Sequence, residues 1–431
     1  MRKYFAFILL ILLTVLVWYK TLNQTFLGEG FYYFDKGQDF FSKGTIVSIW
    51  EYDNFAKILF DILPPIFQDN LQLYQAFQLL TLIALTLVFY KFIKYFSKNS
   101  WLSFTGAVIF CVSYLGLFEM IGVGNYQRFA QRIPNQILLL LSFIQLAKFY
   151  DSNNIKNYFH SLILFTISVF LAHFSTFWLP IFVIYPVIYS ICNKTKIPTI
   201  IKNIVYLIPF VLINLFLISR DVHTPNTNFF SFIKDHGVVQ ITTQIILQLS
   251  NMLLPPFLIE KIASVTSSYK DILIILTLPI LVIFLLGFYL VKRKQKNLSV
   301  IYLLSIVSVP ILLFLNLYLG KVNPLYNMRG YTYYFLSNFY SSDPSLTATL
   351  KGDRSYMLPY FFLAIIIAIL IYVLFKRKFI YKIITFIFIA VYIFYNILLV
   401  KTNIAKIQPA SEDMKKYLSY MKSVSKTFNN Q

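Results

Sequence analysis

The stretch that decides the fold is YMLPYFFLAIIIAILIYVLF, residues 356–375, which contains no charged side chain. An α-helix needs about 20 apolar residues to cross the hydrocarbon core of a bilayer. Ten further apolar runs lie along the chain, at 4–19, 72–90, 101–118, 134–149, 158–173, 176–192, 204–219, 271–291, 299–319 and 379–400. The sequence therefore predicts an all-α polytopic membrane protein with about eleven transmembrane helices.

The composition agrees with a membrane protein. Of the 431 residues, 58% are hydrophobic and only 13% are charged, and the mean hydropathy is +0.67. A soluble domain carries roughly twice that share of charge. The net charge of +21 comes from basic residues spread among short loops. Such loops orient a chain in a membrane, so the charge does not indicate nucleic-acid binding.

The short basic loops predict the orientation. With the N-terminus inside, these loops all lie on the cytoplasmic side, as the positive-inside rule requires. Their basic residues are Lys91, Lys94, Lys98, Lys148, Lys156, Lys194, Lys196, Lys202, Lys292, Arg293, Lys294, Lys296, Lys376, Arg377 and Lys378. Of the 17 acidic residues, only Asp151 lies inside in this topology. We therefore expect a multi-pass protein of the cytoplasmic membrane whose carboxylates serve its outer face.

Three long outer segments, 21–71, 220–270 and 320–355, connect the predicted helices. Loops of this length usually have a function or are disordered. Within the second, 238–258 has apolar residues at helical spacing, which predicts an amphipathic helix lying on the outer leaflet. This stretch is also long enough to cross the membrane, and 54–67 offers a compensating crossing, so both possibilities stay open.

Candidate acidic residues lie where outer segments begin. Glu29 and Asp35 follow the first predicted helix in LGEGFYYFDKGQDFF, residues 27–41, among aromatic side chains that suit a membrane interface. Asp35 and Asp39 are spaced one helical turn apart, so a solvated helix face is the plainer interpretation of that pair. Glu119 ends the third predicted helix, at a depth where an ionisable group is usually functional.

Arginines mark the mouths of two predicted helices. Arg354 and Tyr356 precede the helix that opens in KGDRSYMLPYFF, with Pro359 in its first turn. Arg128 and Arg132 precede the fourth helix in NYQRFAQRIPNQILLLL, where Pro134 is also expected in the first turn; this places both arginines at the interface. A guanidinium can hold two phosphate oxygens at once. The plainer interpretation is that these arginines anchor the helices to bulk phospholipid.

These elements resemble the GT-C superfamily of polyprenyl-phosphate-dependent membrane glycosyltransferases, which includes protein O-mannosyltransferases and aminoarabinose transferases. GEGFYYFD looks like the acid-and-tyrosine element of the family's first outer loop, although Glu29 follows Gly28 where the family has an acid pair. QRIPNQILLLL and RSYMLP look like the Arg-x-Pro and Arg-Tyr-x-x-Pro elements. The resemblance covers the first four helices and 350–375.

The resemblance implies a GT-C-like glycosyltransferase domain over 1–400, with short interfacial helices in its outer loops, followed by a polar tail, 401–431, that we expect to form one surface helix. The implied reaction transfers a sugar, with inversion, from a polyprenyl-phosphate donor to a hydroxyl of a glycan, lipid or protein acceptor. The resemblance further implies an extracytoplasmic active site in a domain that membrane lipids surround.

The resemblance also implies roles for the candidate residues. Glu29 is the preferred catalytic base, followed by Asp35 and Glu119. The lipid phosphate is held by Arg354, Arg128, Arg132 and Tyr356. No metal ligand or cofactor is assigned, although the acids of the first loop leave a divalent metal possible.

Two other functions stay open. A surface-polysaccharide polymerase of the O-antigen kind would use basic residues in later outer loops, such as Arg220, Arg329 and Arg354. A flippase or transporter of a lipid-linked sugar would place ionisable groups at mid-membrane, often with repeats or broken helices. The acids of this sequence gather in loops and no repeat is visible, which favours transfer over transport.

Overall fold

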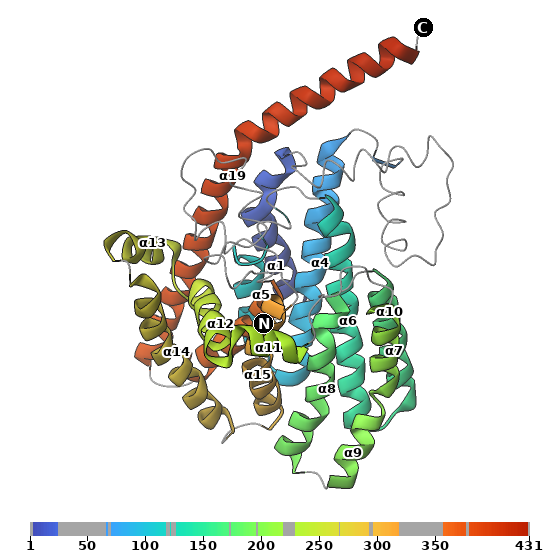
Figure 1. The fold of residues 1–431 in the computed structure, drawn as a ribbon, viewed down its shortest axis with the longest axis vertical. Helices are drawn as coiled ribbons and strands as arrows, with labels where there is room; N and C mark the ends of the chain where they lie inside the picture. The colour runs from blue at the N-terminus through green and yellow to red at the C-terminus, as the bar shows by residue number, and fades with distance from the viewer. Residues whose placement is uncertain are drawn as a thin grey trace.

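The computed structural model describes residues 3–24, 66–67, 70–117, 121, 126–171, 174–194, 197–218, 229–266, 268–292, 296–318, 357–375 and 379–429. All regular elements in these ranges are helices (Figure 1). They are α1 (Lys3–Trp18), η1 (Tyr19–Asn23), α4 (Leu71–Ser97), α5 (Ser100–Cys111), α6 (Tyr126–Ser152), α7 (Ile155–Leu171), α8 (Phe174–Asn193), α9 (Ile197–Val205), α10 (Ile208–Ile218), α11 (Phe229–His236), α12 (Val238–Leu253), α13 (Pro256–Val265), α14 (Tyr269–Lys292), α15 (Lys296–Tyr318), α18 (Met357–Phe375) and α19 (Phe379–Asn429).

Each of the eleven predicted apolar runs contains a helix in the described ranges. Within the described ranges, eight are long and apolar enough to cross a membrane, namely α1, α4, α6, α8, α14, α15, α18 and α19. Three shorter apolar helical stretches are α5, α7 and Ile201–Phe216, which covers most of α9 and α10. The described chain is thus an all-α polytopic membrane protein, as the sequence predicted. Eleven crossings and the GT-C fold stay predictions.

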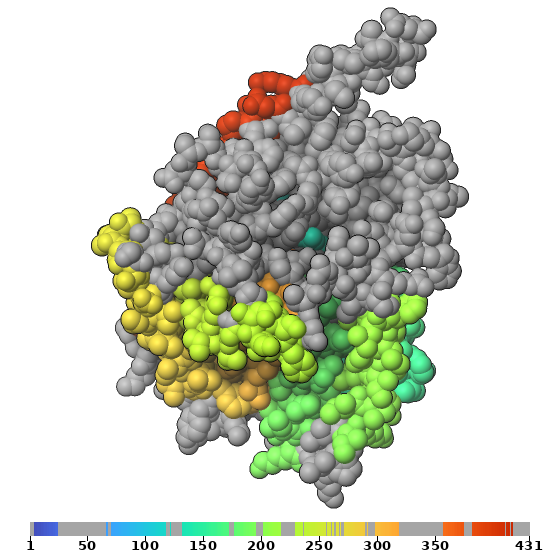
Figure 2. All heavy atoms as spheres, in the orientation of Figure 1, coloured from blue at the N-terminus to red at the C-terminus, as the bar shows by residue number. Residues whose placement is uncertain are grey.

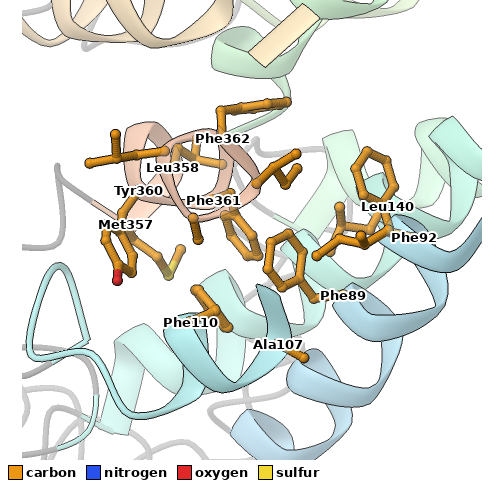
Figure 3. Packing of buried hydrophobic residues seen from close by; sticks show 14 of the residues in the cluster. Phe89, Phe92, Ala107, Phe110, Leu140, Met357, Leu358, Tyr360, Phe361 and Phe362 are labelled. Carbon is orange, nitrogen blue, oxygen red and sulfur yellow. The ribbon is translucent and has the colours of Figure 1, made fainter. Parts of the chain in front are cut away.

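α18 is the central helix of the bundle. Of its residues Met357–Leu374, 83% are buried, whereas the corresponding share is 22% in α14 and 17% in α19. A helix that is apolar all round suits such a buried position. Figure 3 shows side chains at the start of α18 lying against α5 and α4. Its first turn includes Pro359, as predicted.

Aromatic rings lock α18 to its neighbours. The ring of Phe361 stacks on Phe110 of α5 with centroids 4.5 Å apart, and it meets Phe89 of α4 edge-on at 5.0 Å (Figure 3). One residue on, Phe362 lies 5.7 Å from the ring of Trp178 in α8. Such pairs stabilise a core beyond the area they bury. α18 therefore joins α4, α5 and α8 through two successive side chains.

One end of the bundle, here called the basic end, is where α4, α6 and α8 finish together. Asp151 of α6 accepts hydrogen bonds there from the hydroxyls of Tyr95 in α4 and Tyr189 in α8, the second at 3.0 Å. The ammonium group of Lys98 lies 4.3 Å from the centre of the Tyr95 ring. Asp151, the one acid predicted inside, thus ties three helices together.

One predicted helix end and one predicted helix start are wrong. The third apolar run was expected to be helical through 118, but α5 ends at Cys111. The fourth helix was expected to open at Pro134, but α6 begins at Tyr126 and Pro134 lies inside it. Arg128 and Arg132 are therefore within α6 rather than before it. Pro134 is tolerated because a membrane helix can satisfy the freed carbonyl locally.

The predicted amphipathic stretch 238–258 forms α12 and the start of α13, separated at Leu254 and Pro255. Its second half packs into the bundle instead of lying on lipid, because polar contacts hold it: the hydroxyls of Ser250 and Thr277 are 2.5 Å apart. The tail is helical to Asn429, as a continuation of α19 that projects from the bundle (Figure 1). The stretch 54–67 lies outside the described residues except 66–67.

Replacing Phe361 by Ala should lower the free energy of unfolding by about 3–5 kcal/mol, because the change removes a ring from a packed core. Phe386→Ala is the matched control, since the Phe386 side chain of α19 is 71% exposed toward the surface that lipid would cover. The measurement is unfolding of the purified protein in detergent. Equal losses in both variants would contradict the central position of α18.

Candidate functional site

A buried break in the helical backbone follows α5. The helix has 12 residues, which span only about 18 Å, and residues 112–117 continue as turns and irregular backbone. We call this segment the junction. Five of its side chains are at most 7% exposed: Val112, Ser113, Tyr114, Leu115 and Leu117. Non-helical backbone is tolerated at membrane depth only where protein buries it or it lines a cavity.

Side chains from three other helices satisfy the last carbonyls of α5. The indole Nε1 of Trp18 in α1 donates to the carbonyl of Cys111 at 2.9 Å. The hydroxyls of Tyr360 in α18 and Tyr392 in α19 donate to the carbonyl of Ile109 at 3.1 and 3.3 Å. In a bilayer no water is at hand for these groups. The end of α5 is therefore a point where α1, α18 and α19 meet.

The junction itself is held by α19. The backbone N–H of Tyr114 donates to Oδ1 of Asn396 at 2.9 Å, and the N–H of Leu115 donates to the Ser113 hydroxyl at 3.0 Å. Asn396 is 5% exposed, and its Nδ2 donates to the carbonyl of Tyr392 one turn earlier. Because both polar groups of this amide are bonded, its orientation is fixed.

Gly116 brings the junction against the start of α18. Its φ is +69°, and a Cβ atom at this position would lie 2.3 Å from the backbone nitrogen of Met357 and 2.4 Å from its Cα. Only glycine combines this left-handed conformation with so close an approach. The chain therefore packs backbone to backbone at this contact, which joins the third and tenth predicted helices.

Most of the residues proposed from the sequence lie outside the described part of the chain: Glu29, Asp35, Glu119, Arg354 and Tyr356. Two of these residues are close in sequence to residues that make the contacts described above. Glu119 follows Gly116 by three residues, and Arg354 precedes Met357 by three. The described Gly116–Met357 contact thus joins the two segments that lead to one candidate base and one candidate phosphate ligand.

Buried carboxamides gather at the end of the bundle opposite the basic end, which we call the amide end. Five of them are at most 1% exposed: Gln24, Gln75, Gln78, Asn135 and Gln136. Gln75 Nε2 donates to the carbonyl of Gln24 at 3.2 Å, which ties the start of α4 to the chain after α1. Buried polar groups are costly in a membrane and are usually bonded or functional.

Arg132 lies in α6 at the same end. Its side chain is half-buried, and its Nη1 atom is shielded from solvent. The parallel helices α4 and α6 are aligned by the contact of Phe92 with Phe143, whose ring centroids are 5.8 Å apart. At 1.5 Å per residue, Gln78 lies about 21 Å and Arg132 about 16 Å from this contact along their helices. A cationic side chain therefore lies within about one helical turn of the level of the buried carboxamides.

Arg128 belongs to α6 by its backbone, one helical turn before Arg132, and its side chain is outside the described part. For a metal, no group of three or more His, Cys, Asp or Glu side chains lies together in the ranges that the structure describes. The acids of the first loop, which the sequence offers for a divalent ion, fall outside those ranges. The metal therefore stays a possibility raised by the sequence alone.

The sequence interpretation did not select the residues that build the junction. Trp18, Tyr360, Tyr392 and Asn396 lie within or beside apolar runs, where an aromatic or amide side chain gives no spacing pattern of its own. Asn396 offered the clearest signal, since a buried amide in a lipid-exposed helix needs a partner. Its partner, Tyr114, lies 282 positions away, and only the fold reveals the pair.

Comparison of the chain with protein-family models, with curated proteins and with solved structures found no match. The contacts described above and the resemblance of three short sequence elements to GT-C enzymes are therefore the features that bear on function.

Gly116→Ala should destabilise the protein far more than Gly237→Ala. Both glycines have a positive φ, +69° and +72°, but an added Cβ meets the Met357 backbone at position 116 and open space at position 237. We expect about 1–3 kcal/mol from backbone strain at Gly237 and a larger loss at Gly116. Thermal unfolding in detergent compares them, and similar midpoints would contradict the close packing of the junction on α18.

Proposed function

We propose that the chain is a GT-C-like glycosyltransferase that moves a sugar from a polyprenyl-phosphate donor to an acceptor hydroxyl at the extracytoplasmic face of the cytoplasmic membrane. The main support is the Gly116–Met357 contact, because it joins the segments that lead to Glu119 and Arg354. The amide end also lies opposite the basic loops, where the positive-inside rule places the outer face.

The reaction needs a base, because a hydroxyl is a poor nucleophile at neutral pH. A positioned carboxylate typically contributes about 10²–10⁴ in rate. We assign this role to Glu29, which follows Gln24 by five residues. The carbonyl of Gln24 is bonded to Gln75 in α4, so the described chain is held just before the first loop. Asp35 and Glu119 are the alternative bases.

The leaving group is a lipid phosphate, whose negative charge grows as the glycosidic bond breaks. Fixed cations stabilise such charge best where water is excluded. Arg132, half-buried at the amide end, supplies one such cation, and Arg354, Arg128 and Tyr356 complete the proposed clamp. The carrier's tail would remain in the lipid that surrounds α14 and α19.

Transport of a lipid-linked sugar is the second candidate, because the junction is a broken helix and transporters bind substrate at such breaks. The carboxylates of the described spans favour transfer, however. Asp271 lies in the first turn of α14 and Asp151 near the end of α6, so neither is at mid-helix. The two functions differ in one observable, the formation of a new glycosidic bond.

Glu29→Gln should lower sugar transfer by at least about 100-fold while the protein still inserts, because the amide cannot accept the hydroxyl proton. The assay incubates purified protein in liposomes with a polyprenyl-phosphate sugar and a hydroxylated acceptor, and it detects the product by mass spectrometry. Glu51→Gln, in the same loop, is the control. A fully active Glu29→Gln variant would rule out Glu29 as the base.

Arg354→Ala should raise the KM for the donor by about tenfold or more, and it should change the KM for the acceptor little, because a charge-assisted contact to phosphate is lost. Arg354→Lys should recover part of the affinity, since it keeps the charge without the two-pronged geometry. Lys351→Ala controls for loss of surface charge. An unchanged KM for the donor would contradict the clamp.

A further inference from the structure

α6 carries a second buried donor one helical turn inward from Arg132. Gln136 follows Arg132 by four residues, so the two side chains lie on the same face of α6. Arg132 is half-buried and Gln136 is 0% exposed. Going into the bundle, a group bound by the guanidinium would therefore meet the Gln136 carboxamide next.

Trp178 of α8 fixes which atom of that carboxamide is free to bind. An indole N–H can only donate, so it must face the carbonyl oxygen of the amide. Trp178 Nε1 lies 2.7 Å from Gln136 Oε1, and both side chains are fully buried. The Nε2 atom then carries the free N–H donors of the amide. It is buried, and it has no acceptor in the part of the chain that the structure describes.

A donor in this position favours an anionic ligand. A buried N–H without an acceptor is unfavourable, so the site gains from an oxygen that fills it. The positive charge of Arg132 on the same face favours an oxygen that carries negative charge over a neutral hydroxyl. Phosphate oxygens meet both requirements, because they accept several hydrogen bonds and carry charge.

We propose that Gln136 is a ligand-binding residue whose Nε2 donates to an oxygen of the phosphate that Arg132 holds. The class of ligand is a prenyl phosphate or diphosphate. This inference deepens the proposed function and depends on it. It adds a neutral donor, set one turn deeper than the arginines, to the residues that recognise the head of the carrier.

The competing explanation is that Gln136 only ties α6 to α8 through Trp178. Two substitutions separate these roles. Gln136→Met keeps the side-chain length but removes both the donor and the acceptor, whereas Trp178→Phe removes the interhelix bond and leaves the amide donor in place. Gln136→Glu is the second variant, because it keeps an acceptor for Trp178 and sets a carboxyl group against the anion.

The experiment measures the Kd of a C20 prenyl phosphate for the full-length protein in nanodiscs, with the C20 alcohol and inorganic phosphate as separate probes. We expect Gln136→Met and Gln136→Glu to weaken prenyl-phosphate binding by about tenfold or more, and to leave alcohol binding unchanged. Trp178→Phe should weaken prenyl-phosphate binding much less. Gln248→Met is the matched control, since Gln248 is equally buried but its Nε2 already donates to the carbonyl of Leu313.

Three outcomes would overturn the inference. Equal losses in Gln136→Met and Trp178→Phe would show that the residue is only structural; the proposed function would survive if Arg132→Ala still lost phosphate binding. Inorganic phosphate bound as tightly as the prenyl phosphate would exclude the lipid carrier as the ligand. Wild-type protein that binds the phosphate no better than the alcohol would overturn the inference and the proposed donor together.

Discussion

The constraint on which the structure depends is that α5 stops inside the protein, where its last backbone groups have no water. The carbonyl of Ile109 has no helical partner, because the N–H of Ser113 donates to Phe110 instead, at 3.1 Å. Each such group must find a donor within the protein. Hydrogen bonds from α1, α18 and α19 meet this need, so one short helix determines how three longer ones are placed around it.

The same constraint separates what the sequence could predict from what it could not. Helix positions follow from apolar runs, and each of the eleven runs contains a helix in the described part of the chain. The end of α5 does not follow, because the run stays apolar to Phe118 and the donors that cap it are distant: Trp18 lies 93 positions from Cys111. Gly116 is a local sign of a turn in the sequence. A single glycine does not reveal, however, that the turn contacts Met357.

The sequence predicted only some of the residues of the candidate site. Arg132 was selected from its spacing before an apolar run, and the structure shows it half-buried within α6. Gln136 was passed over, because a glutamine inside QRIPNQILLLL has no distinguishing pattern until Trp178 is seen beside it. Glu29, Asp35 and Arg354 remain predictions that rest on sequence elements. The described contacts bear on them through Gln24 and Met357, where the chain enters or leaves these segments.

The two ends of the bundle use different chemistry. The basic end relies on a carboxylate that is exposed to solvent, Asp151, so its charge stays hydrated. The amide end relies on neutral carboxamides, which cost far less to bury than an isolated charge. Only 17% of the residues in the apolar, membrane-spanning part of α19 are buried. Its polar contacts are nevertheless specific. Asn396 accepts from the N–H of Tyr114, and Lys415 donates to the carbonyl of Asn23 at 2.6 Å. Both contacts fall on segments that lead to candidate acids, Glu119 and Glu29. A helix that the lipid surrounds would thus hold the described chain just before the two segments that carry these acids.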